Sequence, residues 1–243
     1  MKTLDVVAIG VSAALYAGFG YLTNLGIVTP LIGVVRFWPS VIIPAVFAIT
    51  FGPIVGGLGA AIGIFISDML MHGNVLLSLV AGVPANFVAF FLVGYIGRKQ
   101  ISKQVVVVTT MLGLLIGGAS LWLYSTGRLD LATAGLFTGV CVLSALLTLA
   151  ISIIWPTRRS YGVASTVGLA VGSAMVGIGV WGFSQIFMLP SGETALPLYA
   201  SVVWFIWTYA TEIPFLIILV PPIMKACYAA FPRFKPSSSS ESS

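Results

Sequence analysis

Long apolar stretches separated by short polar segments run along the whole chain. Most of them contain about 20 residues, the length that an α-helix needs to cross ~30 Å of hydrocarbon. The alternation of apolar and polar positions that is typical of outer-membrane barrel strands is absent from the sequence. The pattern therefore predicts an all-α integral membrane protein with a single transmembrane domain over residues 1–235.

Eight membrane-spanning helices are expected from this pattern. They are Leu4–Leu25, Phe37–Phe51, Gly52–Met71, Val75–Ile96, Gln104–Tyr124, Leu131–Trp155, Val163–Leu189 and Leu198–Ala229. The second is short, so we expect it to be partly buried in protein, and the last is long enough to be tilted or extended. Pro53 and the Gly73-Asn74 pair are turn signals between spans. The Ser-rich residues 236–243 predict a disordered tail.

Composition agrees with a membrane protein, since 7% of the 243 residues are charged and 59% are hydrophobic. The first apolar stretch starts close to Met1, is too long for the core of a signal peptide and is followed by no convincing cleavage site, so we expect a retained span. Cys141 and Cys227 lie far apart in or beside apolar segments, which favours small buried residues over a disulfide or a metal site.

The distribution of basic residues predicts the orientation of the chain. With the N-terminus in the cytoplasm and eight reversals, nine of the eleven Lys and Arg residues are cytoplasmic, as the positive-inside rule requires. These nine are Lys2, Arg98, Lys99, Lys103, Arg158, Arg159, Lys225, Arg233 and Lys235. Arg36 and Arg128 remain outside. We therefore expect a multi-pass cell-membrane protein with both termini in the cytoplasm, and no binding of nucleic acid.

A first group of candidate binding residues is expected at the outer membrane face. It consists of Arg36, Trp38, Asp68, His72 and Asn74. Aromatic walls, one cation and several hydrogen-bonding groups suit a small, partly polar ligand. The alternatives are structural: an Asp68–Arg36 ion pair, an interfacial polar role for His72, and a place for Trp38 in the aromatic belt.

A second group lies deeper within the spans. Glu212 belongs to the last span, and an ionisable residue at that depth usually faces a cavity or a partner because its burial is costly. Asn86 follows Pro84 in the fourth span, where the proline frees a backbone carbonyl. Trp204 and Trp207 precede Glu212 in the last span and suit either ligand binding or the aromatic belt.

Small residues form stripes on two spans. Gly59 and Gly63 share one face of the third span, and the motif Ala13-x-x-x-Ala17 lies in the first. Such stripes let helix backbones approach closely, either within the protein or against a partner.

The motifs of common enzymes are missing from the sequence. It contains no phosphate-binding G-x-x-x-x-G-K-[ST] loop, no H-E-x-x-H, no G-x-S-x-G and no Asp-rich cluster that would hold Mg²⁺. We expect no ATPase or other catalytic activity and no cofactor or metal.

Several motifs resemble those of the substrate-binding (S) components of energy-coupling factor transporters. They are Arg36-Phe37-Trp38-Pro39, Phe51-Gly52-Pro53, Gly56-Gly57-Leu58-Gly59-Ala60-Ala61, Ser67-Asp68, Val83-Pro84-Ala85-Asn86-Phe87, Gly94-Tyr95-Ile96-Gly97-Arg98-Lys99, Glu212-Ile213-Pro214 and Val220-Pro221-Pro222-Ile223. The likeness covers residues 4–100 well and 163–230 moderately.

The resemblance implies a subunit that captures a vitamin or similar small nutrient from outside. Ala13 and Ala17 would then dock on the transmembrane T component, residues 26–37 would cover the substrate, and two partner ATPases would drive uptake. The family usually has six helices, so the resemblance implies that 104–155 is an inserted helical hairpin, made of 104–124 and 131–155.

Other functions stay open at this point. One is an ion-coupled secondary transporter. The low number of carboxylates within the spans and the lack of an evident internal repeat argue against it. Others are a non-catalytic membrane scaffold and a membrane enzyme using Asp68, His72 and Glu212. Arg36 indicates an anionic ligand group and the tryptophans a flat ring, and the sequence identifies neither further.

Overall fold

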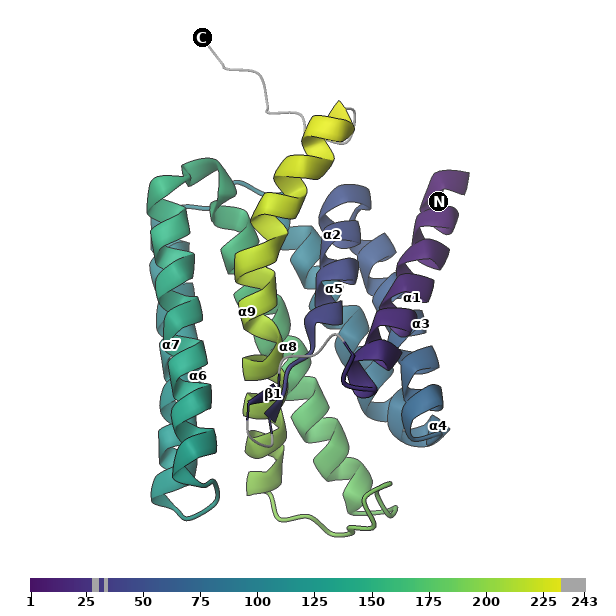
Figure 1. Ribbon diagram of the computed structural model, residues 1–243, viewed down its shortest axis with the longest axis vertical. Helices are drawn as coiled ribbons and strands as arrows, with labels where there is room; N and C mark the ends of the chain where they lie inside the picture. Colours follow the sequence, from purple (N-terminus) through teal and green to yellow (C-terminus); the bar gives the residue numbers. More distant parts are fainter. Residues whose placement is uncertain (28–30, 33–34, 233–243) are drawn as a thin grey trace.

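The computed structural model describes residues 1–27, 31–32 and 35–232, and these form a bundle of α-helices (Figure 1). The α-helices are α1 (Thr3–Asn24), α2 (Ile42–Phe51), α3 (Pro53–Met71), α4 (Val75–Leu77), α5 (Val83–Gly97), α6 (Lys103–Ser125), α7 (Leu131–Ile154), α8 (Arg159–Ser184) and α9 (Tyr199–Ala230). Short 3₁₀ turns, Pro39–Val41 and Pro156–Arg158, precede α2 and α8, and a π-helical turn, Ser78–Gly82, joins α4 to α5. The expected tail 236–243 lies outside the described residues. So do residues 28–30 and 33–34 of the segment 26–37 that was expected to cover the substrate.

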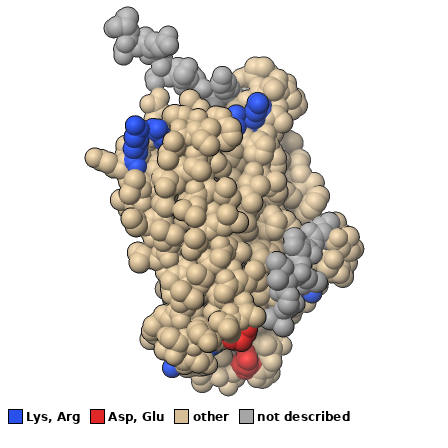
Figure 2. Space-filling view, turned by 60° about the vertical axis from the view of Figure 1, so that its left-hand side comes forward, with Lys and Arg blue, Asp and Glu red and all other residues tan. Residues whose placement is uncertain are grey.

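Seven helical segments are long and apolar enough to cross a membrane, judged by length and composition. They are Thr3–Asn24, Pro53–Met71, Val75–Gly97, Lys103–Ser125, Leu131–Ile154, Pro156–Ser184 and Tyr199–Ala230. The face drawn in Figure 2 has Lys, Arg, Asp and Glu near the two ends of the molecule and an uncharged band between them. The prediction of an all-α, multi-pass membrane protein is therefore confirmed.

The expected span Phe37–Phe51 is instead a shorter apolar helix, Pro39–Phe51, so eight full-length spans are not confirmed. At 1.5 Å per residue this helix covers only about 20 Å. It is preceded by extended chain, in which β1 (Leu31–Ile32) pairs antiparallel with β2 (Val35–Arg36). Val35 and Phe37 are 1% and 5% exposed, and non-helical backbone at membrane depth is tolerated when protein surrounds it.

The N-terminus and the end of α9 lie at the same end of the bundle (Figure 1). Seven of the nine Lys and Arg residues in the described part of the chain belong to segments at this end: Lys2, Arg98, Lys99, Lys103, Arg158, Arg159 and Lys225. This segregation agrees with a cytoplasmic location for both termini. The orientation itself stays a prediction.

Close packing between helices depends on glycine at two kinds of position. A sharp turn separates α2 from α3 at Gly52, whose φ of +117° favours glycine. The stripe of Gly59 and Gly63 on α3 packs against α1, because a Cβ on either residue would lie within 3.0 Å of atoms of α1. Internal packing of this stripe is thus confirmed.

Helices α6 and α7 form an antiparallel hairpin at one side of the bundle, next to α9 (Figure 1). Gly113 and Gly117 of α6 each place a Cβ position 3.1 Å from a Cβ of α7. Phe137 of α7 packs edge-on against Trp207 of α9 at 5.3 Å between ring centroids. The hairpin therefore covers α9 and leaves the helices on the far side of the bundle uncovered.

The end of α8 differs from the expected span Val163–Leu189, because the helix stops at Ser184. The following loop folds back on this end. Ser184 Oγ accepts a hydrogen bond from the N–H of Leu196 at 3.1 Å, and Gln185 Nε2 donates to the Leu196 carbonyl at 2.9 Å. The expected span continued to Leu189 because Ile186–Leu189 are apolar. In the structure these residues lie in the loop that follows α8.

Candidate functional site

A small, partly open pocket, called the interior cavity below, lies between α5, α8 and α9. It is lined by Ala85, Asn86, Ala89, Phe90, Leu169, Gly172, Ser173, Val176, Thr208 and Glu212. Four of these residues carry polar side chains, one of them the carboxylate of Glu212. The volume is about 20 Å³, enough for one water molecule or one small ion.

A hydrogen-bonded chain connects this cavity to α1. The Tyr16 hydroxyl donates to Asn86 Oδ1 at 2.9 Å, and Asn86 Nδ2 donates to the Gly82 carbonyl at 3.0 Å. Tyr16 is buried on α1 and packs edge-on against Phe90. The orientation of the Asn86 amide is thus fixed from both sides, which leaves one lone pair of its oxygen for another partner.

Trp38 completes this polar group at the end of the extended segment that follows β2. Its side chain lies within hydrogen-bonding reach of the Tyr16 hydroxyl. A Cβ at Gly20 would lie 3.2 Å from the Trp38 ring, so the glycine gives the indole room to lie against α1. Trp38 is therefore partly buried and packs against the core of the bundle.

The backbone of Trp38 is also attached to α9 beside Glu212. Its N–H donates to the carbonyl of Thr211 at 3.1 Å. Pro214, one turn further, lacks the N–H of a regular helix and disturbs the hydrogen bonding of this part of α9. The chain at Trp38, just before α2, is consequently fixed to α9 at the level of the candidate carboxylate.

Asp68 lies on the other side of the π-helical turn. Its Oδ2 accepts from Ser78 Oγ at 2.6 Å, and its Oδ1 lies 3.6 Å from His72 Nε2. A Cβ on Gly82 would lie 2.7 Å from Asp68 Oδ2, so the carboxylate packs against the turn whose carbonyl orients Asn86. Wide turns of this kind within helices often occur at functional sites.

The alternative of an Asp68–Arg36 ion pair is wrong for this structure. Arg36 is exposed and donates from its guanidinium to Asn24 at the end of α1, with 3.1 Å to the side-chain oxygen. Asp68 is bonded to Ser78 and paired with His72. Arg36 therefore stabilises the end of a helix and does not line the interior cavity.

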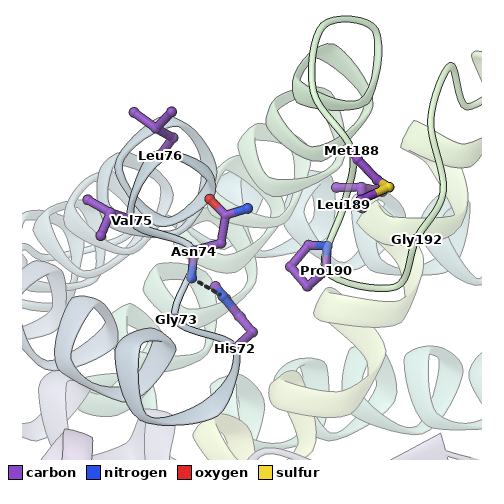
Figure 3. A pocket seen from close by; sticks show the side chains of 9 residues that line it. All are labelled: His72, Gly73, Asn74, Val75, Leu76, Met188, Leu189, Pro190 and Gly192. Carbon is purple, nitrogen blue, oxygen red and sulfur yellow. Dashed lines mark hydrogen bonds between the residues drawn. The ribbon is translucent and has the colours of Figure 1, made fainter.

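An open groove of about 500 Å³ lies at the end of the bundle away from the termini (Figure 3). Its walls are His72, Gly73, Asn74, Val75 and Leu76 on one side and Met188, Leu189, Pro190 and Gly192 on the other. The polar groups here are used within their own loop, since His72 Nδ1 accepts from the N–H of Asn74 at 3.1 Å. Asn74 Oδ1 in turn accepts from the N–H of Leu77 at 3.0 Å.

Trp204 and Trp207 do not line the interior cavity. Trp207 packs against Phe137 of the hairpin, and Trp204 is 41% exposed on α9. Ala13 and Ala17 are buried in the contact of α1 with α3, where Gly63 would place a Cβ 2.9 Å from the Ala13 carbonyl. Their role in docking stays a prediction.

The structure thus brings Trp38, Asn86 and Glu212 together and places His72 and Asn74 at the groove. Two further cavity residues, Ser173 and Thr208, were missing from the sequence prediction, as was Tyr16, which bonds to the cavity residue Asn86. Thr208 lies four residues before Glu212 on the same helix face, a spacing that the sequence already contains. Tyr16 and Ser173 come from α1 and α8, and their convergence depends on tertiary packing.

These features define an α-helical, multi-pass membrane protein with a carboxylate-containing interior site. Comparison with known protein families, with curated proteins and with solved structures found no match for the chain.

Proposed function

We propose that this protein is a membrane-embedded substrate-capture subunit for uptake of a vitamin-like small nutrient, driven by partner ATPases through a T component. The observation that carries the proposal is the interior site, where Glu212, Asn86 and Ser173 meet around a cavity between α5, α8 and α9. Ionisable residues in membrane spans usually mark substrate or ion pathways, because their burial is costly.

The connection between α1 and α2 supports the same proposal. In this structure the cavity is about 20 Å³, whereas pockets for drug-sized molecules have roughly 300–1,000 Å³. Capture of a nutrient therefore requires the cavity to widen. Trp38 lies close to the start of α2, and its movement would break the hydrogen bond from its N–H to Thr211 and its contact with α1 at Gly20.

The outer face of α1 supports an interaction with a T component. Gly10, Ala14 and Gly18 are spaced four apart on this face and are exposed. A Cβ on Gly10 or Gly18 would meet no atom of the protein within 4 Å. If α1 docks on a partner helix, these three residues form the close contact and the buried pair Ala13 and Ala17 supports α1 from behind.

Native mass spectrometry of protein purified gently from its own membranes tests the proposal. The wild type and the control E193Q, changed at an exposed loop carboxylate, should retain one small molecule per chain, and a T component and ATPases should co-purify. E212Q should lose the small molecule. An apo spectrum for every variant, with no ATPase present, would contradict the proposal and favour an ion-coupled secondary transporter.

A further inference from the structure

We propose that Glu212, Asn86, Ser173 and Thr208 form a binding site for a small monovalent cation, either an alkali metal ion or the ammonium group of the captured nutrient. The ammonium form of this inference rests on the proposed function, and the alkali-ion form does not. Both sources present one positive charge to the same oxygen ligands.

The first argument is the uncompensated charge of Glu212. The lining of the cavity contains no Lys, Arg or His, and the one ion pair within the described part of the chain joins His72 to Asp68. A carboxylate enclosed by helices without a positive partner is costly in a low-dielectric medium. A bound cation removes most of that cost.

The basic residues of the described chain are all committed elsewhere. Arg36 bonds to Asn24, and Arg128 lies over the ring of Tyr199 at 3.7 Å. The remaining Lys and Arg side chains belong to the end of the bundle that carries the termini. The charge that Glu212 needs must therefore come from a ligand or from a proton.

The neighbouring titratable groups do not supply a positive charge either. Tyr16 of α1 points its hydroxyl to Asn86, and the carboxyl of Asp68 on α3 lies behind Gly82 and is paired with His72. None of these groups places a positive charge on the lining of the cavity. A cation is therefore favoured over an anion.

The second argument is an unpartnered hydroxyl. Ser173 is 1% exposed, lines the cavity, and its Oγ has no hydrogen-bond partner within the described structure. Buried polar groups are nearly always bonded. Of the eight buried side-chain atoms that lack a partner in the described structure, Ser173 Oγ is the one that lines the cavity. Thr208 adds a second hydroxyl, four residues from Glu212 on α9.

The chemistry and size of the site agree with a small cation. A carboxylate, an amide oxygen and two hydroxyls are hard oxygen ligands, and the available set lacks the clustered His, Cys, Asp and Glu residues that hold transition metals. A cavity of about 20 Å³ fits one alkali ion or one ammonium group. Proline-disturbed helices provide ion sites of this kind in transporters.

Thermal unfolding of the full chain in nanodiscs of neutral phosphatidylcholine at pH 8 tests the site. The probes are sodium chloride and methylammonium chloride, each against N-methylglucamine chloride at equal ionic strength. At 100 times its Kd, a bound cation should raise the unfolding midpoint by roughly 5 to 11 °C. A response to sodium alone identifies an alkali-ion site, and a response to methylammonium identifies an ammonium site.

Variants decide whether the response belongs to this cavity. E212Q should abolish the shift, while the control E193Q should keep it. S173A, which folds with one hydroxyl fewer, should raise the Kd for the responding cation roughly tenfold or more. No shift in the wild type with either salt, or an equal shift in E212Q, would overturn the inference.

The failure of this inference is distinguishable from failure of the proposed function. A nutrient that stays bound in wild type and S173A while neither salt shifts the midpoint leaves substrate capture standing and removes the cation site. A sodium shift that depends on Glu212, without any retained nutrient or ATPase, establishes the ion site and removes substrate capture.

Discussion

Gly177 on α8 offers a sensitive test of the packing that encloses the cavity. A Cβ at this position would lie 2.2 Å from the carbonyl oxygen of Ser201 and 3.2 Å from the backbone nitrogen of Phe205, both on α9. The obstacle is backbone, so no side chain can rotate away. G177A therefore forces α8 and α9 apart by on the order of 1 Å, next to the cavity residue Val176.

The expected cost is the difference between two effects. Overpacking of a tight contact costs about 1–3 kcal/mol. Replacing glycine by alanine within a helix returns up to about 1 kcal/mol. Gly118 of α6 supplies the matched control, because it is exposed in mid-helix and a Cβ there meets no atom within 4 Å. G118A should therefore show only the stabilisation of up to about 1 kcal/mol that comes from replacing glycine by alanine within a helix.

Thermal unfolding in nanodiscs measures both variants. We expect the midpoint of G177A to lie below that of G118A by roughly 2 to 12 °C, which corresponds to a difference of about 1–3 kcal/mol. G177A should also weaken retention of any ligand that needs the closed cavity. Equal midpoints for G177A and G118A would refute the close approach of α8 and α9 at Ser201.

Three further predictions concern the site, a helix start and the orientation. Y16F removes the hydroxyl that donates to Asn86, so the free energy of unfolding should fall by about 0.5–1.5 kcal/mol relative to wild type. Chemical denaturation measures this difference, and unchanged stability would argue against the hydrogen bond. Asp130 caps α7, and the hydrogen bond from Thr133 lowers the pKa of the Asp130 carboxyl. The stabilisation of the protein by this cap is therefore fully present above the ordinary Asp pKa and is lost as the pH falls through the lowered pKa. D130A should unfold at a lower temperature than wild type at pH 7, with a gap that closes in acid; a gap that persists at pH 2 would contradict the capping role. In a cysteine-free background, K225C should react with an impermeant thiol reagent only from the cytoplasmic side and R128C only from outside, and labelling of both from one side would contradict the orientation.

The long helices could be predicted from the sequence because burial in lipid demands about 20 apolar residues and closed backbone hydrogen bonding. The start of α2 could not be predicted in this way. Phe37 and Trp38 are apolar whether the chain at these residues is helical or extended, so hydropathy does not distinguish the two conformations. The end of α8 was also mispredicted, because the bonds of the 185–196 loop to Ser184 leave no trace in hydropathy.

The candidate site was predictable only where a single residue carried the signal. Glu212 and Asn86 stood out because polar groups are costly within a span, and both line the cavity. Tyr16 and Ser173 gave no such signal, since a tyrosine and a serine are common in spans and only packing brings Ser173 to the cavity and Tyr16 to Asn86. Arg36 was assigned to the binding group from its position in the chain, although its side chain reaches back to α1.

The hairpin of α6 and α7 restricts how the proposed subunit could meet its partners. It covers α9 on one side of the bundle, with Phe137 against Trp207, while α1 lies at the opposite side (Figure 1). A T component that approached through α9 would have to displace this contact. The outer face of α1, with Gly10, Ala14 and Gly18, is uncovered within the described structure and needs no such displacement. Since Gly20 and Tyr16 of the same helix lie against Trp38, and Tyr16 bonds to the cavity residue Asn86, a partner that tilts α1 would act on the surroundings of the cavity.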